Sequence, residues 1–283
     1  MTLPRFDARN FAAATPEMIA AFARDGVLVL ENYASVAECD AMKTRMAEIT
    51  TGFDPDAHRT VFSATADEPS RDRYFLDSAT DIRFFFEAGA LDTQGNLTRP
   101  LNVAINKVGH ALHTLDPVFS AFSNSEKMMG LAKALGHVQP DPVQSMYIFK
   151  QPEIGGEVVC HQDATYLWTE PQSVLGFWLA VEDATEENGC MWAIPGAHVG
   201  DAPKERFRRT GDTGTYTETL DATPFEEEKK VPLAVPKGTL IVLHGLLPHL
   251  SGPNLSPRSR HAYTVHVVDG AAHYPADNWL QRA

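Results

Sequence analysis

Cysteine is scarce in this chain, and its spacing excludes the sites that cysteine usually builds. The 283 residues contain only Cys39, Cys160 and Cys190. An odd number with no Cys-x-x-Cys pair implies neither a disulfide framework nor a zinc ribbon. We therefore expect the protein to work in a reducing compartment.

Long apolar runs are also missing. No run approaches the ~18 residues that a membrane-spanning helix needs. The N-terminal segment, Met1 to Asp7, lacks the basic-then-apolar pattern of a signal peptide. A content of 43% hydrophobic and 9% aromatic residues is typical of a globular protein. We expect a cytoplasmic protein with no membrane partner.

Basic residues are outnumbered by acidic ones, 24 to 37, which gives a formal net charge of −13. Affinity for nucleic acid comes mainly from clustered lysine and arginine, so we expect no nucleic-acid partner. One basic cluster, Lys204 to Arg209, could meet an anionic substrate. The pattern favours a solvated loop instead.

Helical signals dominate the first third of the chain. Thr15-Pro16 caps a helix that Gly26 ends, and a short strand follows over residues 27–30. Ser35 and Glu38 form a capping box at the start of a second helix. A further helix is predicted over residues 125–135. Residues 52–100 are loop-like, apart from an apolar patch at residues 83–86 that is predicted to be core first and pocket wall second.

Strand patterns dominate the second half. The predicted strands are residues 143–150, 158–163, 175–181, 190–194, 239–244 and 262–268. Short strands separated by Gly/Pro turns favour a sandwich or jelly roll over βαβ units. The Asn-Gly pair in Glu187-Asn188-Gly189 predicts a hairpin turn.

Together these patterns predict a mainly β fold, a double-stranded β-helix of the jelly-roll or cupin-like kind braced by N-terminal helices. We expect one domain over residues 1–283. About residues 1–136 supply helical support and strands, and about residues 137–270 form the jelly-roll core.

His161-Gln162-Asp163 is the first element of a candidate metal site. On a β-strand, side chains two positions apart point to the same face, so His161 and Asp163 can reach one ion. A third ligand has to come from elsewhere, and both His249 and His244 are available. Two imidazoles and one carboxylate on one face of an octahedron leave three positions open, which is typical of non-haem Fe(II) oxygenases, whereas zinc prefers a closed tetrahedron or a single open position.

An arginine in the last predicted strand suggests an anion site. Arg260 has the same strand parity as Ala262 and Thr264, and a guanidinium buried inside a barrel needs an anion. The distal carboxylate of a cosubstrate would suit it. Arg258 is the rival for this role.

Five longer segments carry a resemblance to a known family. They are Ile82–Glu87, Ile105–His113, Gln144–Pro152, Ala180–Thr185 and Asn278–Gln281. On these segments, and on the histidines and arginines above, the chain resembles the phytanoyl-CoA dioxygenase family of iron and 2-oxoglutarate dependent oxygenases. The resemblance covers nearly the whole length.

The resemblance implies a set of site residues and an activity. The iron ligands would be His161, Asp163 and His249, which selects His249 over His244. The residues that hold 2-oxoglutarate would be Lys107, Met146, Trp178, Ser251 and Arg260. The implied enzyme is an Fe(II)- and 2-oxoglutarate-dependent dioxygenase that hydroxylates a small organic or acyl substrate with O₂, releases succinate and CO₂, and is supported by ascorbate. Residues 199–230 resemble the family least, and would serve substrate choice or form a variable loop.

Other readings of the same residues remain. The metal site could belong to a non-catalytic jelly-roll binding module, or to a metal-assisted hydrolase that needs no 2-oxoglutarate. Trp178 could be a plain core aromatic, and Lys107 would ordinarily be exposed. The remaining histidines considered are predicted to be structural or exposed: His110, His113, His198, His244 and His266. Aromatic residues that could line an apolar pocket are Tyr147, Tyr166, Trp168, Trp192 and Phe84 to Phe86.

Overall fold

The computed structural model describes residues 3–55, 60–61, 73–211 and 214–281. Part of the segment predicted to be loop-like, residues 52–100, lies outside these ranges. Within the described ranges, no helix is both long enough and apolar enough to cross a membrane.

The N-terminal elements follow the local sequence signals closely. They are β1 (Arg5–Asp7), α1 (Pro16–Asp25), β2 (Val27–Glu31) and α2 (Val36–Thr51). Thr15 caps α1 by accepting from the backbone N–H of Met18, and Gly26 ends the helix with φ 70°. Ser35 and Glu38 form the predicted capping box of α2. Both helices and the short strand are confirmed.

The middle of the chain holds more regular structure than the sequence patterns indicated. Its elements are α3 (Arg73–Asp77), β3 (Ile82–Phe86), η1 (Leu101–Val103), β4 (Ile105–His110), α4 (Leu112–Leu115), α5 (Pro117–Ser123) and α6 (Glu126–Ala134). The helix predicted over residues 125–135 is confirmed as α6, with Ser125 as its cap. The loop prediction was wrong for residues 73–77, because α3 is too short to show a period of its own and depends on tertiary packing. The apolar patch at residues 83–86, which was predicted to be core, lies in β3.

The second half is built almost entirely of strands. They are β5 (Pro140–Ile148), β6 (Val158–His161), β7 (Leu175–Ala180), β8 (Met191–Ala193), β9 (Glu205–Thr210), β10 (Gly214–Thr219), β11 (Val231–Leu233), β12 (Leu240–His244), β13 (His249–Ser251) and β14 (Ala262–Asp269), with the short helices η2 (Asp163–Thr165) and η3 (Glu227–Lys229). All six predicted strands are present with shifted ends. Strands β9, β10, β11 and β13 were not predicted.

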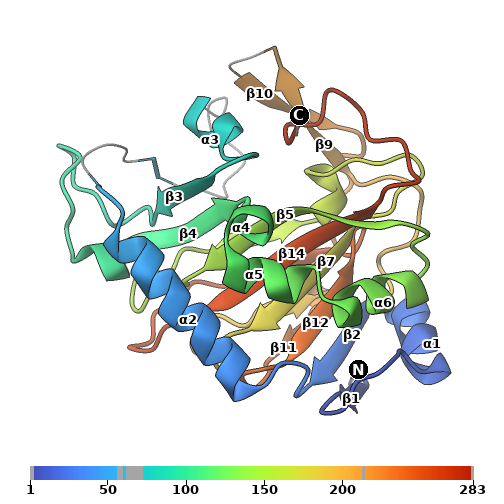
Figure 1. Cartoon of the computed structure of the whole chain (residues 1–283). Coiled ribbons are helices and arrows are strands. Elements are labelled where there is room, and N and C mark those ends of the chain that lie inside the picture. Colours follow the sequence, from blue (N-terminus) through green and yellow to red (C-terminus); the bar gives the residue numbers. More distant parts are fainter. Residues whose placement is uncertain (1–2, 56–59, 62–72, 212–213, 282–283) are drawn as a thin grey trace.

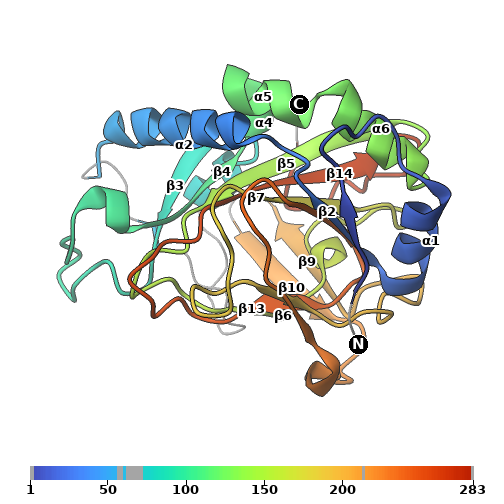
Figure 2. The same cartoon turned by 90° about the horizontal axis from the view of Figure 1, so that it is seen from below.

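Two sheets face each other across the molecule. The larger sheet has the order β1-β2-β12-β7-β14-β5-β4-β3, and the smaller has the order β11-β8-β13-β6. Helices α2, α4 and α5 lie over the outer side of the larger sheet, while β6 and β13 lie on its other side (Figures 1 and 2). This arrangement confirms the predicted jelly roll with helices bracing it.

Hydrogen bonds join the first and second parts of the chain within the larger sheet. Strand β2 pairs with β12, and β4 pairs with β5. The organisation into one domain, with support up to about residue 136 and the core after it, stays a prediction.

The turn at Glu187-Asn188-Gly189 does not make a hairpin. Gly189 does have positive φ, 80°, and the Asn188 side chain accepts from the backbone N–H of Thr185. However, the turn carries the chain from β7 in the larger sheet to β8 in the smaller one. Turn chemistry reports local geometry and does not say which strands pair, so the hairpin prediction was wrong.

The basic cluster at residues 204–209 is a strand and not a solvated loop. It forms β9, which pairs with β10 as an antiparallel hairpin. Arg206 and Arg208 both form ion pairs with Asp277, at 2.6 and 2.5 Å. Five of the six residues in this segment are charged and only Phe207 is apolar, so the sequence has no alternation that would predict a strand.

The main hydrophobic core lies between the helices and the larger sheet. It includes side chains of α2, α5, β2 and β14, among them Met42, Phe119, Leu30 and Tyr263. On β3, Phe84 and Phe86 join this core, whereas Phe85 packs with Phe75 and Trp279 in a separate cluster. The prediction that the apolar patch is core is therefore confirmed for both faces of β3.

We predict that Leu30→Ala lowers the free energy of unfolding by about 2–5 kcal/mol, because the side chain is fully buried opposite Leu240 in the core of the larger sheet. Chemical denaturation checks this value. Val36→Ala is the control, since Val36 is 62% exposed and should change stability by no more than about 0.5 kcal/mol. Equal losses in both variants would contradict the assignment of Leu30 to the core.

Candidate active site

A cavity of about 490 Å³ opens between the two sheets. Its walls come from β5, β7 and β14 of the larger sheet, from β6 and β13 of the smaller sheet, and from the β9–β10 hairpin. A cavity of this size is in the range of sites for small molecules.

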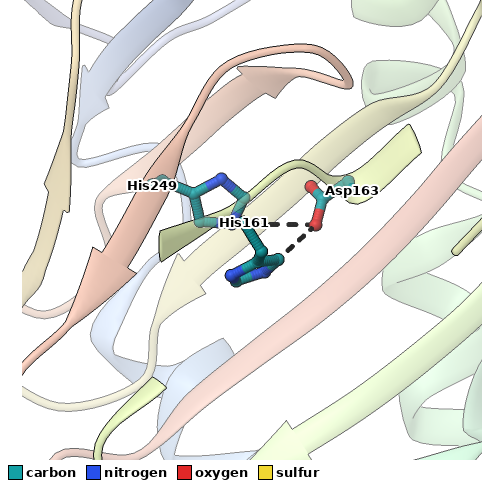
Figure 3. A group of neighbouring side chains, drawn as sticks. All are labelled: His161, Asp163 and His249. Carbon is teal, nitrogen blue, oxygen red and sulfur yellow. Dashed lines mark ion pairs between the residues drawn. The ribbon is translucent and has the colours of Figure 1, made fainter. Parts of the chain in front are cut away.

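Three potential metal ligands meet on one wall of the cavity. His161 is the last residue of β6, Asp163 begins η2, and His249 begins β13. The pairing of β13 with β6 puts His249 directly opposite His161. The Nε2 atoms of His161 and His249 lie 3.8 and 3.7 Å from Oδ1 of Asp163 (Figure 3). One ligand atom from each residue lies within 4.8 Å of the others, so the group could hold one metal ion.

The predicted strand over residues 158–163 ends early, at His161. Gln162 nevertheless keeps extended backbone angles, φ −120° and ψ 133°, before η2 begins. His161 and Asp163 therefore still project to the same side, as the spacing predicted. His249 lies in a separate strand, β13, which follows β12 in the chain.

Backbone contacts orient both imidazole rings. Nδ1 of His161 is 2.8 Å from the carbonyl of Val159, and Nδ1 of His249 is 3.0 Å from the carbonyl of Leu247. Because Nδ1 donates its proton to a carbonyl, Nε2 is left as the free lone pair that a metal needs.

A glycine leaves the space that the carboxylate occupies. A Cβ atom placed on Gly176 of β7 would be 2.5 Å from Oδ2 of Asp163. No van der Waals contact is that short, so any larger residue at this position would displace the carboxylate.

The electrostatics of the group favour the forms that bind metal. Burial acts to raise the pKa of the Asp163 carboxyl, but His266, His249 and His161 hold that pKa below its usual range. Burial, followed by repulsion from His249, lowers the pKa of His161 to about 4. A carboxylate and a neutral imidazole are the forms that metal binding requires.

His266 was predicted to be a structural or exposed histidine and not a metal ligand. It is buried, lines the cavity, and its Nε2 lies 3.3 Å from Oδ1 of Asp163. His110 lines the cavity as well. The signal for His266 was available, because it has the same strand parity as Arg260 and Thr264.

His244, the alternative third ligand, lies elsewhere. Its ring is 5.0 Å from that of His198 and 6.1 Å from that of Phe22. It is not among the described residues that line the cavity. The structure therefore brings His249, and not His244, to His161 and Asp163.

The inner end of the cavity is positively charged. Arg260 is only 2% exposed, its Nε donates to the carbonyl of Gly189, and its guanidinium lies 5.2 Å from the centre of the Trp178 ring. Its Nη1 is buried without a partner in the described part of the chain. Burial lowers the pKa of Arg260 to about 10, so it remains charged at neutral pH. The rival Arg258 is 67% exposed and faces Glu187 at 3.5 Å.

The other residues expected to hold the cosubstrate also line the cavity. Lys107 is buried, not exposed, and its Nζ lies 3.7 Å from Sδ of Met146. Ser251 accepts from Nζ of Lys150 at 3.0 Å. Lys150 was not singled out, although it ends the strand predicted over residues 143–150 and has the same parity as Met146 and Ile148, which also line the cavity.

The outer wall of the cavity is aromatic, but mostly from residues other than those expected. Of the predicted aromatics, only Tyr166 is among the described lining residues. Tyr147 instead forms a hydrogen bond with His261 inside the core. The wall is completed by Phe75, Phe207 and Trp279. They come from α3, β9 and the C-terminal segment, which converge only in the folded chain.

The cavity between the two sheets therefore has three potential metal ligands on one wall and buried cations at its inner end. An octahedral metal held by two imidazoles and one carboxylate keeps open positions toward the cavity, where a second anionic chelator and a diatomic gas can bind. The buried arginine provides the countercharge for the far end of that chelator.

The chain is similar to characterised families over nearly its whole length. A family model described as Phytanoyl-CoA dioxygenase (PhyH) matches residues 22–262. The chain is 46% identical to phytanoyl-CoA dioxygenase domain-containing protein 1 of Bos taurus, over 95% of this chain and 96% of that protein. It is 45% identical to a phytanoyl-CoA dioxygenase of Arabidopsis thaliana, over 95% of this chain and 94% of that protein.

Solved structures share the fold at lower identity. EctD from S. alaskensis with 2-oxoglutarate and 5-hydroxyectoine has a TM-score of 0.65 and 20% identity, covering 100% of this chain and 91% of that one. The epimerase SnoN in complex with Fe³⁺, alpha ketoglutarate and nogalamycin RO has a TM-score of 0.64 and 16% identity, covering 94% and 89%. These likenesses confirm the jelly-roll fold.

The family model spans the positions of all three residues of the metal group. The chain therefore belongs to the phytanoyl-CoA dioxygenase family, and it is an oxidoreductase of the dioxygenase class.

Proposed function

We propose that the protein is an Fe(II)- and 2-oxoglutarate-dependent hydroxylase of a small organic or short acyl substrate. The observation that carries this proposal is one cavity with a His-Asp-His group on its wall and, at its inner end, the buried guanidinium of Arg260, whose Nη1 has no partner in the described part of the chain. EctD and SnoN share the fold. The EctD structure is described as a complex with 2-oxoglutarate, and the SnoN structure as a complex with Fe³⁺ and alpha ketoglutarate.

The site residues have separate roles in this proposal. His161, Asp163 and His249 hold the iron, which supplies the activation of O₂. Arg260 pairs with the distal carboxylate of 2-oxoglutarate, with Ser251, Lys107, Met146 and Trp178 around it. In the overall reaction, 2-oxoglutarate, O₂ and a C–H bond give succinate, CO₂ and a C–OH group. A cofactor supplies the redox chemistry, and the protein supplies position and charge.

The chain's own side chains then control water and orientation. Phe75, Phe207 and Trp279 form an apolar wall beside the metal group, which excludes water from the reacting C–H bond. An intact carboxylate at Asp163 favours hydroxylation over halogenation, because chloride would need that ligand position.

The cavity favours a small substrate over an intact acyl-CoA. Its volume of about 490 Å³ has to hold both 2-oxoglutarate and the reacting part of the substrate. The lysines and arginine among its described lining residues are Lys107, Lys150 and Arg260, and Arg260 lies at the inner end. Arg206 and Arg208, on the hairpin, are already paired with Asp277, so they offer little charge to the phosphates of coenzyme A.

A metal-assisted hydrolase would use the same three ligands but has no use for a buried cation opposite the metal. Zinc in such a site keeps a single water position, whereas this cavity extends from the metal group to Arg260. The dioxygenase family of the chain also favours the oxidative reaction.

Formation of succinate tests the proposed function directly. Purified protein supplied with Fe(II), ascorbate and 2-oxoglutarate should form succinate slowly in the absence of any other substrate. His161→Ala, Asp163→Ala and His249→Ala should each abolish this turnover, because two remaining ligands neither retain nor orient the metal. His244→Ala is the control and should retain it. Absence of succinate from iron-loaded wild-type protein would sink the proposal.

Gly176→Ala should weaken binding of Fe(II) by at least about 10-fold while the fold is retained. The added methyl group would lie where Oδ2 of Asp163 lies, so the carboxylate has to turn away from the metal. Anaerobic titration with Fe(II) measures the affinity, and circular dichroism checks the fold. Gly130→Ala in α6 is the matched control, because nothing lies within 4 Å of its added Cβ. Unchanged iron affinity in Gly176→Ala would show that Asp163 is not a ligand.

Arg260→Ala should weaken 2-oxoglutarate by about 30-fold to several thousand-fold, since truncating one partner of a buried charge pair costs roughly 2–5 kcal/mol. Iron binding should survive. Arg258→Ala, with its exposed side chain, should stay near wild type. The measurement is an anaerobic titration of 2-oxoglutarate followed by the absorbance of its iron chelate. An unchanged dissociation constant in Arg260→Ala would remove the anchor for the distal carboxylate.

A further inference from the structure

Lys150 is a buried amine at the inner end of the cavity. It lies just after β5, is 2% exposed, and lines the cavity. Its Nζ donates to the carbonyl of Gly156 at 2.5 Å and to Oγ of Ser251 at 3.0 Å. An ammonium group has three N–H donors, so one donor is not used by the described residues.

The charges around Lys150 do not balance. None of the described carboxylates forms an ion pair with Lys150 or with Arg260, although both cations are buried. Glu87 is the acid that acts most strongly on Lys150, and its Oε2 already accepts from the backbone N–H of Gly156 and from Asn106. Of the charged groups that act on Lys150, Arg260 and Glu87 are buried and Glu157 is exposed, so the buried groups together with Lys150 carry an excess of one positive charge. Such an excess is costly unless an anion compensates it.

We propose that Lys150 is a second cation for the distal carboxylate of 2-oxoglutarate and acts together with Arg260. In this proposal the Ser251 hydroxyl contacts both Lys150 and the cosubstrate. The proposal rests on the proposed function and adds a specificity role. One carboxylate would cancel the excess charge, and a 2-oxo acid that lacks the distal carboxylate would leave it uncompensated. Lys150 therefore selects dicarboxylate cosubstrates.

The protonation of Lys150 gives the proposal a pH signature. Burial, followed by repulsion from Arg260, lowers the pKa of Lys150 to about 7 in the empty site. A bound carboxylate favours the charged amine and raises this pKa, so binding takes up a proton when the pH is above about 7. Affinity for 2-oxoglutarate should then fall as the pH rises from 7 to 9, by at most about tenfold per pH unit.

Other groups that face Lys150 are accounted for. They are Arg260, Glu87, Glu157 and Cys190. Burial lowers the pKa of Arg260 to about 10 and raises the pKa of Cys190 to about 11, so neither group titrates between pH 7 and 9. Groups near the metal affect the binding of every 2-oxo acid that chelates iron to the same degree. Comparison with a second 2-oxo acid that has the same chelating end therefore removes their contribution to the pH dependence.

The test compares two chelators on the anaerobic Fe(II)-loaded protein. 2-Oxoglutarate and 2-oxobutyrate have the same chelating end, but only the first has a distal carboxylate. Lys150→Met should weaken 2-oxoglutarate by about 10- to 100-fold and leave 2-oxobutyrate unchanged, because only one charge-assisted contact is lost. The variant should also lose the pH dependence between pH 7 and 9. Lys133→Met, at an exposed position of α6, should behave as wild type.

Further measurements separate a binding role from a structural one. Circular dichroism and Fe(II) affinity report whether Lys150→Met is folded, and Lys150→Gln serves as the second variant because its amide can still donate to Ser251. Both variants should show the loss for 2-oxoglutarate alone. Equal losses for both acids would make Lys150 structural, and no loss for either would also overturn the proposal. If the wild-type protein binds neither acid, the proposed function itself fails.

Discussion

The pairing of β13 with β6 is the contact on which the rest of the site depends. It puts His249 directly opposite His161, and the extended backbone at Gln162 then carries Asp163 to the same side. Cross-strand neighbours are held at a fixed spacing by the sheet, so the metal group needs no separate scaffold. Gly176 of β7 has no side chain, and this leaves room for the carboxylate of Asp163.

Charge divides the cavity into two ends. The metal wall carries a carboxylate whose pKa is held low, and the inner end carries Arg260 and Lys150, neither of which forms an ion pair with a described carboxylate. A molecule with a chelating group at one end and a carboxylate at the other matches both. Preorganised charge of this kind binds strongly because the cost of burial was met when the chain folded.

Sequence reasoning found those parts that depend on local geometry. Helix caps at Thr15 and Ser35, six strands, and the His161–Asp163 spacing follow from backbone preferences, and all are present. Parity in the last strand predicted the burial of Arg260. The same parity places Lys150 with Met146 and Ile148 on the cavity side, but Lys150 was not singled out. Turn chemistry failed at Asn188, because the strands on either side of the turn lie in different sheets. Pairing between distant strands is decided by the whole core, which no short window contains.

The outer wall of the cavity is a second feature that short segments of sequence could not predict. Phe75, Phe207 and Trp279 come from three distant segments of the chain. Asp277 connects the C-terminal segment to β9, because its carboxylate pairs with Arg206 and Arg208 and its carbonyl accepts from the backbone N–H of Arg209. The metal wall and the inner end are built on paired strands of the two sheets, whereas this wall depends on a hairpin, a five-residue helix and a terminal segment. Changes in those segments can reshape this wall without disturbing the strands that carry His161 and His249. The fold therefore separates the residues proposed to hold the metal from those proposed to contact the substrate.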